Sequence, residues 1–341
     1  MIKFPSIEQF RNVVRKVSDK AQFVGLDAAG DPIFNKLALR PKLQFQGTVK
    51  LHGTNAAIVW NEGAISFQSR ERILTLDADN ACFMSHFIDG KGVSVIESVL
   101  QALNKPLIEI GTLAVYGEWC GGNIQKGVAI TGLPKMFVIF AVKLDEKWQD
   151  MESIQGFSIP EHGVFNIMQF PTFNREIDFE NPAEDQNGLI EFTNQVEAEC
   201  PVGKHFGVSG IGEGIVWRCL TPGWDSSDYW FKVKGEKHSA TKVTKLAEVD
   251  VESVAAINEF VARTVTEQRC EQGLQNLTNE MLKPFEMQSI GDFLRWIFAD
   301  IMKEEADTIE ASGFNQKSLG GPIAKAAKRW YMERLNNLEL A

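Results

Sequence analysis

The chain has 341 residues, of which 44% are hydrophobic and 10% aromatic, and its formal net charge is −10. This composition supplies a packed core and argues against intrinsic disorder. The length predicts one large domain or two of ordinary size. An acidic balance argues weakly against a nucleic-acid binder, because neutralising phosphates requires lysine and arginine. Net charge averages over the whole surface, however, so it does not exclude a local basic groove.

Membrane and disulfide classes are disfavoured by the sequence. No apolar run approaches the roughly 18 residues that a membrane-spanning helix needs, and residues 1–16 do not resemble a signal peptide. The five cysteines are an odd number and contain no CxxC pair. This pattern predicts reduced thiols in a cytoplasmic protein and neither a disulfide framework nor a zinc site.

Strand-like and helical segments alternate through the first two thirds of the chain. Runs rich in β-branched and aromatic residues predict strands at 43–50, 55–61, 64–70, 113–119, 136–144, 214–220 and 229–235. Apolar spacing predicts helices at 92–103 and 188–200. The acidic, turn-rich stretch 171–187 predicts a surface loop. This part of the chain therefore predicts a mixed α and β domain.

After about residue 245 the pattern becomes helical. One apolar stripe at helical spacing consists of Ile290, Phe293, Leu294, Ile297, Phe298, Ile301 and Met302. A second stripe begins at Val254. A third follows Pro322, and we expect this proline in the first turn of its helix. Ser289, with Asp292 three residues later, predicts an N-terminal cap. The change of pattern predicts a first domain at 1–245 and a helical domain at 246–341.

Lys50 ends one predicted strand and leads through His-Gly-Thr-Asn into the next. A lysine amine is a nucleophile only when it is neutral, and nearby cations or burial lower its pKa. Lys232 and Lys234 are two residues apart in a predicted strand, so their side chains point to one face. We expect this pair to bind a polyphosphate and to lower the pKa of Lys50.

Two carboxylates, Glu118 and Glu213, lie next to glycines and beside apolar strands. A carboxylate in this position can bind a ribose hydroxyl or help to hold a divalent metal. A solvated charge at a strand end is the alternative for either residue taken alone.

Six segments occur in a recognisable order. They are VKLHGTN (49–55), SR (69–70), VYGEWCGGNIQKG (115–127), FVIFAV (137–142), EGIVWR (213–218) and WFKVKG (230–235). The series resembles the motifs of covalent nucleotidyltransferases, the polynucleotide ligases and messenger-RNA capping enzymes. Lys-x-His-Gly-Thr-Asn, in place of the usual Lys-x-Asp-Gly, is similar to the RNA ligase 2 family of bacteriophages and to kinetoplastid RNA-editing ligases.

The resemblance implies an α+β fold over roughly residues 1–245. This would be a nucleotidyltransferase (ATP-grasp-like) domain of antiparallel sheets with flanking helices, followed by a small all-helical domain. The resemblance also implies a role for each matching residue. Lys50 would become bonded to AMP, His52 and Asn55 would shape the nucleotide pocket, Glu118 would hold the ribose, Phe140 would stack on adenine, Glu213 would work with the metal, and Lys232 and Lys234 would contact the phosphates.

Three matches are less definite. Arg70 would contact the ribose or the RNA terminus, but Arg72 is close enough to fill the same position. Gln125 and Lys126 match a family Ile-Gln-Lys without a clear role. Arg218 stands where some relatives have lysine, and the two side chains differ in geometry.

The implied activity is that of an ATP-dependent RNA ligase using Mg²⁺ or Mn²⁺. It would form a lysyl-AMP intermediate, transfer AMP to an RNA 5′-phosphate and join that end to a 3′-hydroxyl, as a monomer sealing nicks in duplex RNA or in RNA-containing hybrids. An RNA-capping guanylyltransferase and a non-catalytic RNA-binding relative are the alternatives. Capping enzymes usually continue into a strand-rich OB-type domain, unlike this helical tail. The basic stretch 237–245 could line an RNA path or be a solvated linker.

Overall fold

The computed structural model describes residues 1–27, 30–107, 110–238 and 254–339. The chain divides into two compact units, Met1–Lys237 and His238–Ala341, each with its own hydrophobic core. The predicted boundary at 245–246 and most of the basic stretch 237–245 lie outside the described residues. No helix in the described ranges is both long enough and apolar enough to cross a membrane.

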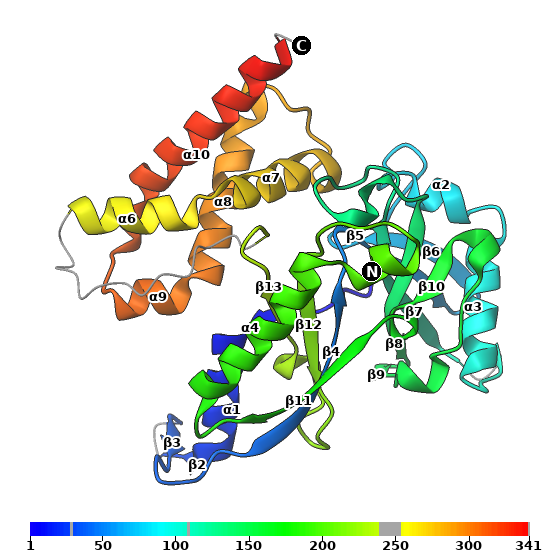
Figure 1. Ribbon diagram of the computed structural model, residues 1–341, viewed down its shortest axis with the longest axis horizontal. Coiled ribbons are helices and arrows are strands. Elements are labelled where there is room, and N and C mark those ends of the chain that lie inside the picture. Colours follow the sequence, from blue (N-terminus) through cyan, green and yellow to red (C-terminus); the bar gives the residue numbers. More distant parts are fainter. Residues whose placement is uncertain (28–29, 108–109, 239–253, 340–341) are drawn as a thin grey trace. The chain divides into compact units, whose positions relative to one another are not determined.

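Two sheets, mainly antiparallel, form the first unit (Figure 1). The first sheet has the order β1-β13-β12-β4-β11, and the second has the order β10-β8-β7-β5-β6 with β9 added beside β8. The pairs β1–β13 and β10–β8 are parallel, whereas β2 and β3 form a separate hairpin. The strands are β1 Glu8–Gln9, β2 Phe23–Leu26, β3 Pro32–Phe34, β4 Lys42–Lys50, β5 Gly53–Asn61, β6 Ala64–Ser69, β7 Thr112–Cys120, β8 Met136–Leu144, β9 Lys147–Trp148, β10 Val164–Asn166, β11 Thr172–Asp178, β12 Gly214–Cys219 and β13 Phe231–Lys234.

Helices flank both sheets of this unit. They are α1 Phe10–Gln22, α2 Phe83–Phe87, α3 Lys91–Ala102, α4 Pro182–Ala198 and α5 Pro201–His205. Helix α1 buries Val13 and Val17 in the core, and α4 packs on β11 and β12. All strands and helices predicted for this part are present, so the predicted α+β fold class is confirmed.

The prediction of a surface loop at 171–187 is wrong. Residues Thr172–Asp178 form β11, which pairs with β4 from Thr48 to Lys42, and α4 begins at Pro182. The stretch looks like a loop because β11 is an edge strand, on which most side chains remain accessible to water. Polar composition at such an edge is common and does not prevent strand pairing.

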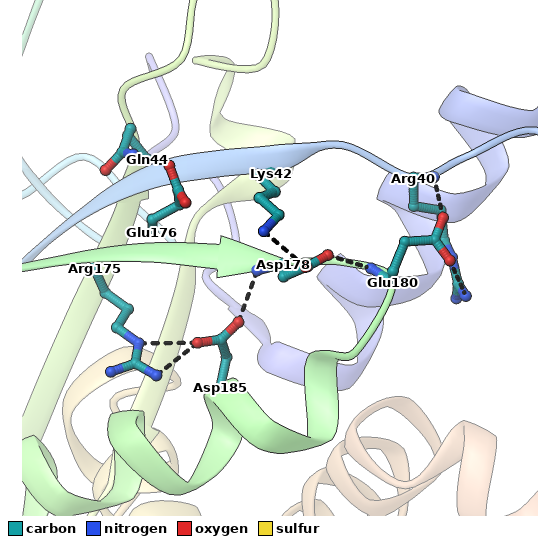
Figure 2. A network of polar contacts seen from close by, with 8 residues as sticks. All are labelled: Arg40, Lys42, Gln44, Arg175, Glu176, Asp178, Glu180 and Asp185. Atoms are coloured by element: carbon teal, nitrogen blue, oxygen red, sulfur yellow. Dashed lines mark hydrogen bonds and ion pairs between the residues drawn. The ribbon is translucent and has the colours of Figure 1, made fainter.

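Polar pairs fix the end of β4 that lies away from Lys50, as Figure 2 shows. Arg175 donates from Nε and Nη2 to one oxygen of Asp185, at 3.0 and 2.6 Å. The other Asp185 oxygen accepts from the backbone N–H of Asp178, whose own carboxylate pairs with Lys42 at 3.2 Å. These contacts attach the first turns of α4 to β11, and β11 to β4.

The described part of the second unit is helical. Its elements are α6 Val254–Thr264, α7 Glu267–Gln275, a π-helical turn Asn276–Glu280, α8 Ile290–Glu304, α9 Ala306–Ala311 and α10 Gln316–Glu339. Helix α8 buries Phe293, Ile297 and Ile301, as its apolar stripe predicts. Arg269, only 1% exposed, pairs with Asp300 and Glu305 inside this unit.

Two local predictions for this unit have different outcomes. Ser289 is the N-cap residue of α8, as predicted, but its side chain makes no capping hydrogen bond, and Asp292 pairs with Lys283 and Arg295. The predicted place of Pro322 in the first turn of its helix is wrong. Pro322 lies inside α10, which begins six residues earlier at Gln316. Proline removes one backbone donor but does not stop a helix whose flanking turns are held by packing, and Leu319 and Ile323 beside it are buried. The side chains of Val254 and Leu338, two other predicted stripe positions, lie outside the described set.

Candidate active site

The first side of the site is one face of the β13-β12-β4 segment of the first sheet. Gly214 lies opposite Lys50 in β4 and opposite Lys234 in β13, and Val216 lies opposite Lys232. Directly opposed residues share a face of a sheet, so the three lysines and Val216 point the same way. A Cβ atom on Gly214 would lie 2.2 Å from the carbonyl oxygen of Val233. Glycine is therefore required where the two lysine-bearing strands meet β12.

Glu213 is the centre of the charged cluster. Its Oε2 atom lies 2.7 Å from Lys50 Nζ and 3.2 Å from His52 Nδ1, and its Oε1 atom lies 3.1 Å from Lys234 Nζ. The Glu213 side chain is only 3% exposed, whereas those of Lys50, His52 and Lys234 are 22%, 21% and 16% exposed. The carboxylate is therefore at the base of the site, with the three nitrogen-bearing groups between it and water.

This cluster decides the charge of each member. Burial alone would raise the pKa of Glu213, but Lys50 and Lys234 hold it well below its usual range. Burial alone would lower the pKa of Lys50, but Glu213 and Glu118 together raise it above its ordinary value. The expected lowering of the Lys50 pKa is therefore wrong for the ligand-free protein. Burial does lower the pKa of Lys234.

Glu118, on β7, is the second carboxylate of the site and is half-buried. Burial raises its pKa to about 7, which the positive charge of Lys50 only partly opposes and the negative charge of Glu213 reinforces. One carboxylate oxygen accepts the backbone N–H of Gly53 at 2.9 Å, and Asn55 lies directly opposite Glu118 on β5. A Cβ atom on Gly53 would lie 2.4 Å from the carbonyl oxygen of Trp119, so the His-Gly-Thr turn requires this glycine.

Phe140 lies on the same face of the second sheet as Glu118 and Asn55. It packs in a cluster with Ala57 and Tyr116, which are opposite each other two residues along β5 and β7. The β7–β8 register shifts at this point and skips Phe140. Its carbonyl oxygen accepts a hydrogen bond from Arg218 of the first sheet. The two faces are therefore linked here by Arg218 and at Lys50 by the Leu51–His52 connection.

Arg70 and Arg72 have different environments. The guanidinium of Arg72 donates to the carbonyl oxygens of Ala78 and Asp79 and so supports the loop after β6. The Arg70 side chain is 49% exposed, and its charge acts on the pKa values of Lys50 and Glu118. This electrostatic effect favours Arg70 over Arg72 as the arginine that acts on the site.

Two residues in the site were not predicted from the sequence. Val216 lies between Thr48 and Lys232 on the face that carries the lysines, and its place in the EGIVWR motif is the signal for it. Asn80 is completely buried and donates to Thr54 Oγ1 at 3.0 Å, which joins the loop after β6 to the lysine motif. No local pattern around Asn80 indicates this contact. Gln125 and Lys126, which match the family's Ile-Gln-Lys, differ in burial: Gln125 is buried and Lys126 is exposed.

The carboxylates fit a metal only together with a nucleotide. Within the described ranges, no group of three or more histidine, cysteine or acidic side chains is placed to hold a metal ion. Both oxygens of Glu213, the predicted metal ligand, already contact nitrogen donors. Mg²⁺ is commonly held by one or two carboxylates with substrate phosphates and water. Glu213 and Glu118 are consistent with that mode.

Comparisons with known proteins give a family and a set of structures. The RNA ligase family model matches residues 43–234, which is more than half of the chain. Curated proteins give no match. A structure of the Naegleria gruberi RNA ligase with PPi is 18% identical with a TM-score of 0.44. A variant of that ligase with AMP and Mn is 17% identical with a TM-score of 0.43. Both matches cover 69% of this chain and 56% of the ligase, so the chain spans little more than half the length of these proteins.

Proposed function

Because the chain belongs to the RNA ligase family, we propose that it is an ATP-dependent RNA ligase in which Lys50 carries AMP between the steps of the reaction. The observation that carries this proposal is the convergence of Lys50, Lys234 and His52 on buried Glu213. An aromatic side chain, Phe140, and a half-buried carboxylate, Glu118, face this cluster from the other sheet. The arrangement supplies a nucleophile, cations that can bind phosphates and an aromatic surface on which a nucleotide base can stack.

The first step would be attack by Lys50 Nζ on the α-phosphorus of ATP. A nitrogen–phosphorus bond forms, the bond from the α-phosphorus to the bridging oxygen breaks, and pyrophosphate leaves. Lys50 must lose its proton first, and its raised pKa in the ligand-free protein keeps it charged. Phosphates that bind Lys234 would compete with Glu213 for this cation, which leaves Glu213 free to accept the proton from Lys50.

A bound Mg²⁺ or Mn²⁺ would neutralise charge that develops on the phosphates. The protein side chains would do the remaining work. Lys234 and Lys232 would hold the β- and γ-phosphates in line with Lys50, and Glu118 and Asn55 would orient the ribose. Phe140 and Val216, from opposite sheets, would enclose the adenine.

The second and third steps would use the RNA ends. An oxygen of the RNA 5′-phosphate attacks the AMP phosphorus and Lys50 leaves, taking up a proton. The 3′-hydroxyl then attacks the 5′-phosphate, a phosphodiester forms and AMP departs. We propose a nicked RNA duplex as the substrate, a monomer as the active form and the cytoplasm as the location. These three proposals follow from the resemblance to the phage RNA ligase 2 family, which is a more specific assignment than the match to the RNA ligase family model.

A covalent-labelling experiment tests the proposal. The protein is mixed with ATP labelled at the α-phosphate and with Mg²⁺, then denatured and examined for a protein-bound label that is labile to acid and stable to base. Lys50→Ala should abolish the label, whereas Lys204→Ala, which changes an exposed lysine paired with Glu199, should retain it. A full-strength adduct on Lys50→Ala would refute Lys50 as the nucleophile.

The same experiment separates the two alternatives. Labelling by GTP in preference to ATP would indicate a capping guanylyltransferase. Absence of any adduct with either nucleotide would indicate a non-catalytic relative. After adduct formation, nicked duplexes with ribose or deoxyribose on each side of the nick would define the substrate.

A further inference from the structure

The segment Ile2–Phe4 lies across the second sheet beside the proposed adenine site. The backbone N–H of Ile2 donates to Gln68 Oε1 on β6 at 3.2 Å, and its carbonyl accepts from the hydroxyl of Tyr116 on β7 at 2.9 Å. Further along, the N–H of Glu8 donates to the carbonyl oxygen of Trp230 at 3.2 Å, beside the first sheet. Residues 2–8 are therefore held at one end by the second sheet and at the other end by the first sheet.

Phe4 is the centre of an aromatic group at this place. Its ring centroid lies 5.1 Å from those of Tyr116 and Phe140, 5.8 Å from Trp148 and 6.1 Å from Trp230. The Phe4 and Phe140 rings meet nearly edge to face, at 63°. Edge-to-face pairs are directional, so Phe4 restricts the orientation of the Phe140 ring.

Phe140 needs this support because its strand does not hold it firmly. The register between β7 and β8 skips it, so it has no opposite residue in β7. Its carbonyl is instead held by Arg218, and the Arg218 guanidinium lies 4.2 Å from the Trp230 ring centroid. Arg218 and Phe4 thus contact Phe140 directly, and Trp230 contacts both Arg218 and Phe4.

We propose that Phe4 is a positioning residue for base recognition: it holds the Phe140 ring in the orientation that stacks on the purine, and so sets the affinity for the base but not for the sugar-phosphate. This inference rests on the proposed function, because it takes Phe140 as the adenine-stacking residue. Phe4 acts through Phe140 and contributes no group to the chemistry.

The test compares binding of AMP with binding of ribose 5-phosphate, which lacks the base, by calorimetry on the full chain. Phe4→Ala should weaken AMP binding by about 2- to 13-fold, the range expected when an aromatic pair worth about 0.5–1.5 kcal/mol is lost. Binding of ribose 5-phosphate should be unchanged. Phe4→Tyr, which keeps the ring, should restore AMP affinity. In adduct formation the same loss should be found in the KM for ATP and not in kcat.

Phe10→Ala is the matched control. Phe10 is also a half-buried phenylalanine near the N-terminus, but its ring contacts Phe231 and Phe179 and not Phe140. Phe10→Ala should leave the affinities for AMP and for ribose 5-phosphate unchanged. Equal weakening of AMP and ribose 5-phosphate by Phe4→Ala would overturn the inference, as would unchanged AMP binding.

A Phe140→Ala variant separates failure of this inference from failure of the proposed function. If Phe140→Ala weakens AMP binding and Phe4→Ala does not, only the role of Phe4 is refuted. If Phe140→Ala has no effect on AMP binding, the base does not stack there, and the adenine site of the proposed function is refuted with it.

Discussion

Glu118→Gln should make the protein more stable at alkaline pH while it removes a group from the proposed nucleotide site. Glu118 is half-buried, and the partial loss of water around its carboxylate raises its pKa to about 7. A neutral glutamine of the same shape keeps an oxygen that can accept the Gly53 N–H, now 2.9 Å from Glu118. The substitution therefore removes the cost of burying a charge and retains the hydrogen bond.

The size and sign follow from linkage between protonation and folding. The pKa rises from an ordinary value of 4.5 to about 7 on folding, so the folded protein binds this proton more tightly. Its stabilising effect is complete below pH 4.5 and is lost as the pH rises through 7. At about 1.4 kcal/mol per pKa unit, the loss is about 3 kcal/mol at pH 8. This is an upper limit for the gain in Glu118→Gln, because Lys50 also loses a nearby negative charge.

Urea unfolding of the full chain, followed by tryptophan fluorescence, measures this difference. Trp119 follows Glu118 directly in the sequence, and six of the eight tryptophans lie in the first unit. Glu118→Gln should exceed the wild type by up to about 3 kcal/mol at pH 8 and by less than about 1 kcal/mol at pH 5. A gain that does not depend on pH, or a loss at pH 8, would refute the reasoning.

Glu213→Gln is the control with the opposite sign. The pKa of Glu213 is held well below its usual range by Lys50 and Lys234, so its ionised form stabilises the fold at neutral pH. That contribution is present above its ordinary pKa and is lost as the pH falls through the lowered value. Breaking a buried ion pair from one side typically costs about 3–5 kcal/mol. Glu213→Gln should therefore be less stable than the wild type at pH 8, where Glu118→Gln is more stable.

Further outcomes are expected for the phosphate lysines, the two arginines and the helical unit. Lys232→Ala and Lys234→Ala should each slow adduct formation by at least ~100-fold, the effect of losing one charge-stabilising group. Single-turnover labelling with ATP measures this rate. Normal rates in both variants would show that the two lysines are solvated surface charges with no role in the reaction. Arg70→Ala should impair nick sealing without changing the melting temperature, whereas Arg72→Ala should lower the melting temperature because two loop carbonyls lose their donor. A fragment of residues 1–245 should still take AMP from ATP and join a pre-adenylylated nick, but it should fail to seal a plain 5′-phosphate nick. Two results would contradict a role of the helices in holding RNA: a folded fragment that loses both the adduct and sealing, or a fragment that seals normally.

The sequence alone determined those features that depend on neighbours along the chain. The strands carrying Lys50, Glu118 and Lys234 could be predicted because β-branched and aromatic residues crowd into short runs there. The two-residue period of a strand also placed Lys232 and Lys234 on one face. The helical stripe ending at Met302 is equally local. The edge strand β11 was missed because most of its side chains are polar and Ile177 alone among them is buried, which leaves no alternating apolar pattern.

Only the tertiary structure decided the charge state of the site and the contacts between distant segments. Glu213 is 163 positions from Lys50, and their contact makes the lysine a stable cation where its lysine neighbours alone predicted a lowered pKa. Asn80 and Phe4 likewise act on residues that are far away in the chain or in another strand. Electrostatic and packing energies depend on distance and burial in three dimensions. The sequence supplies the groups, and the pairing of two sheets decides which groups meet and with what charge.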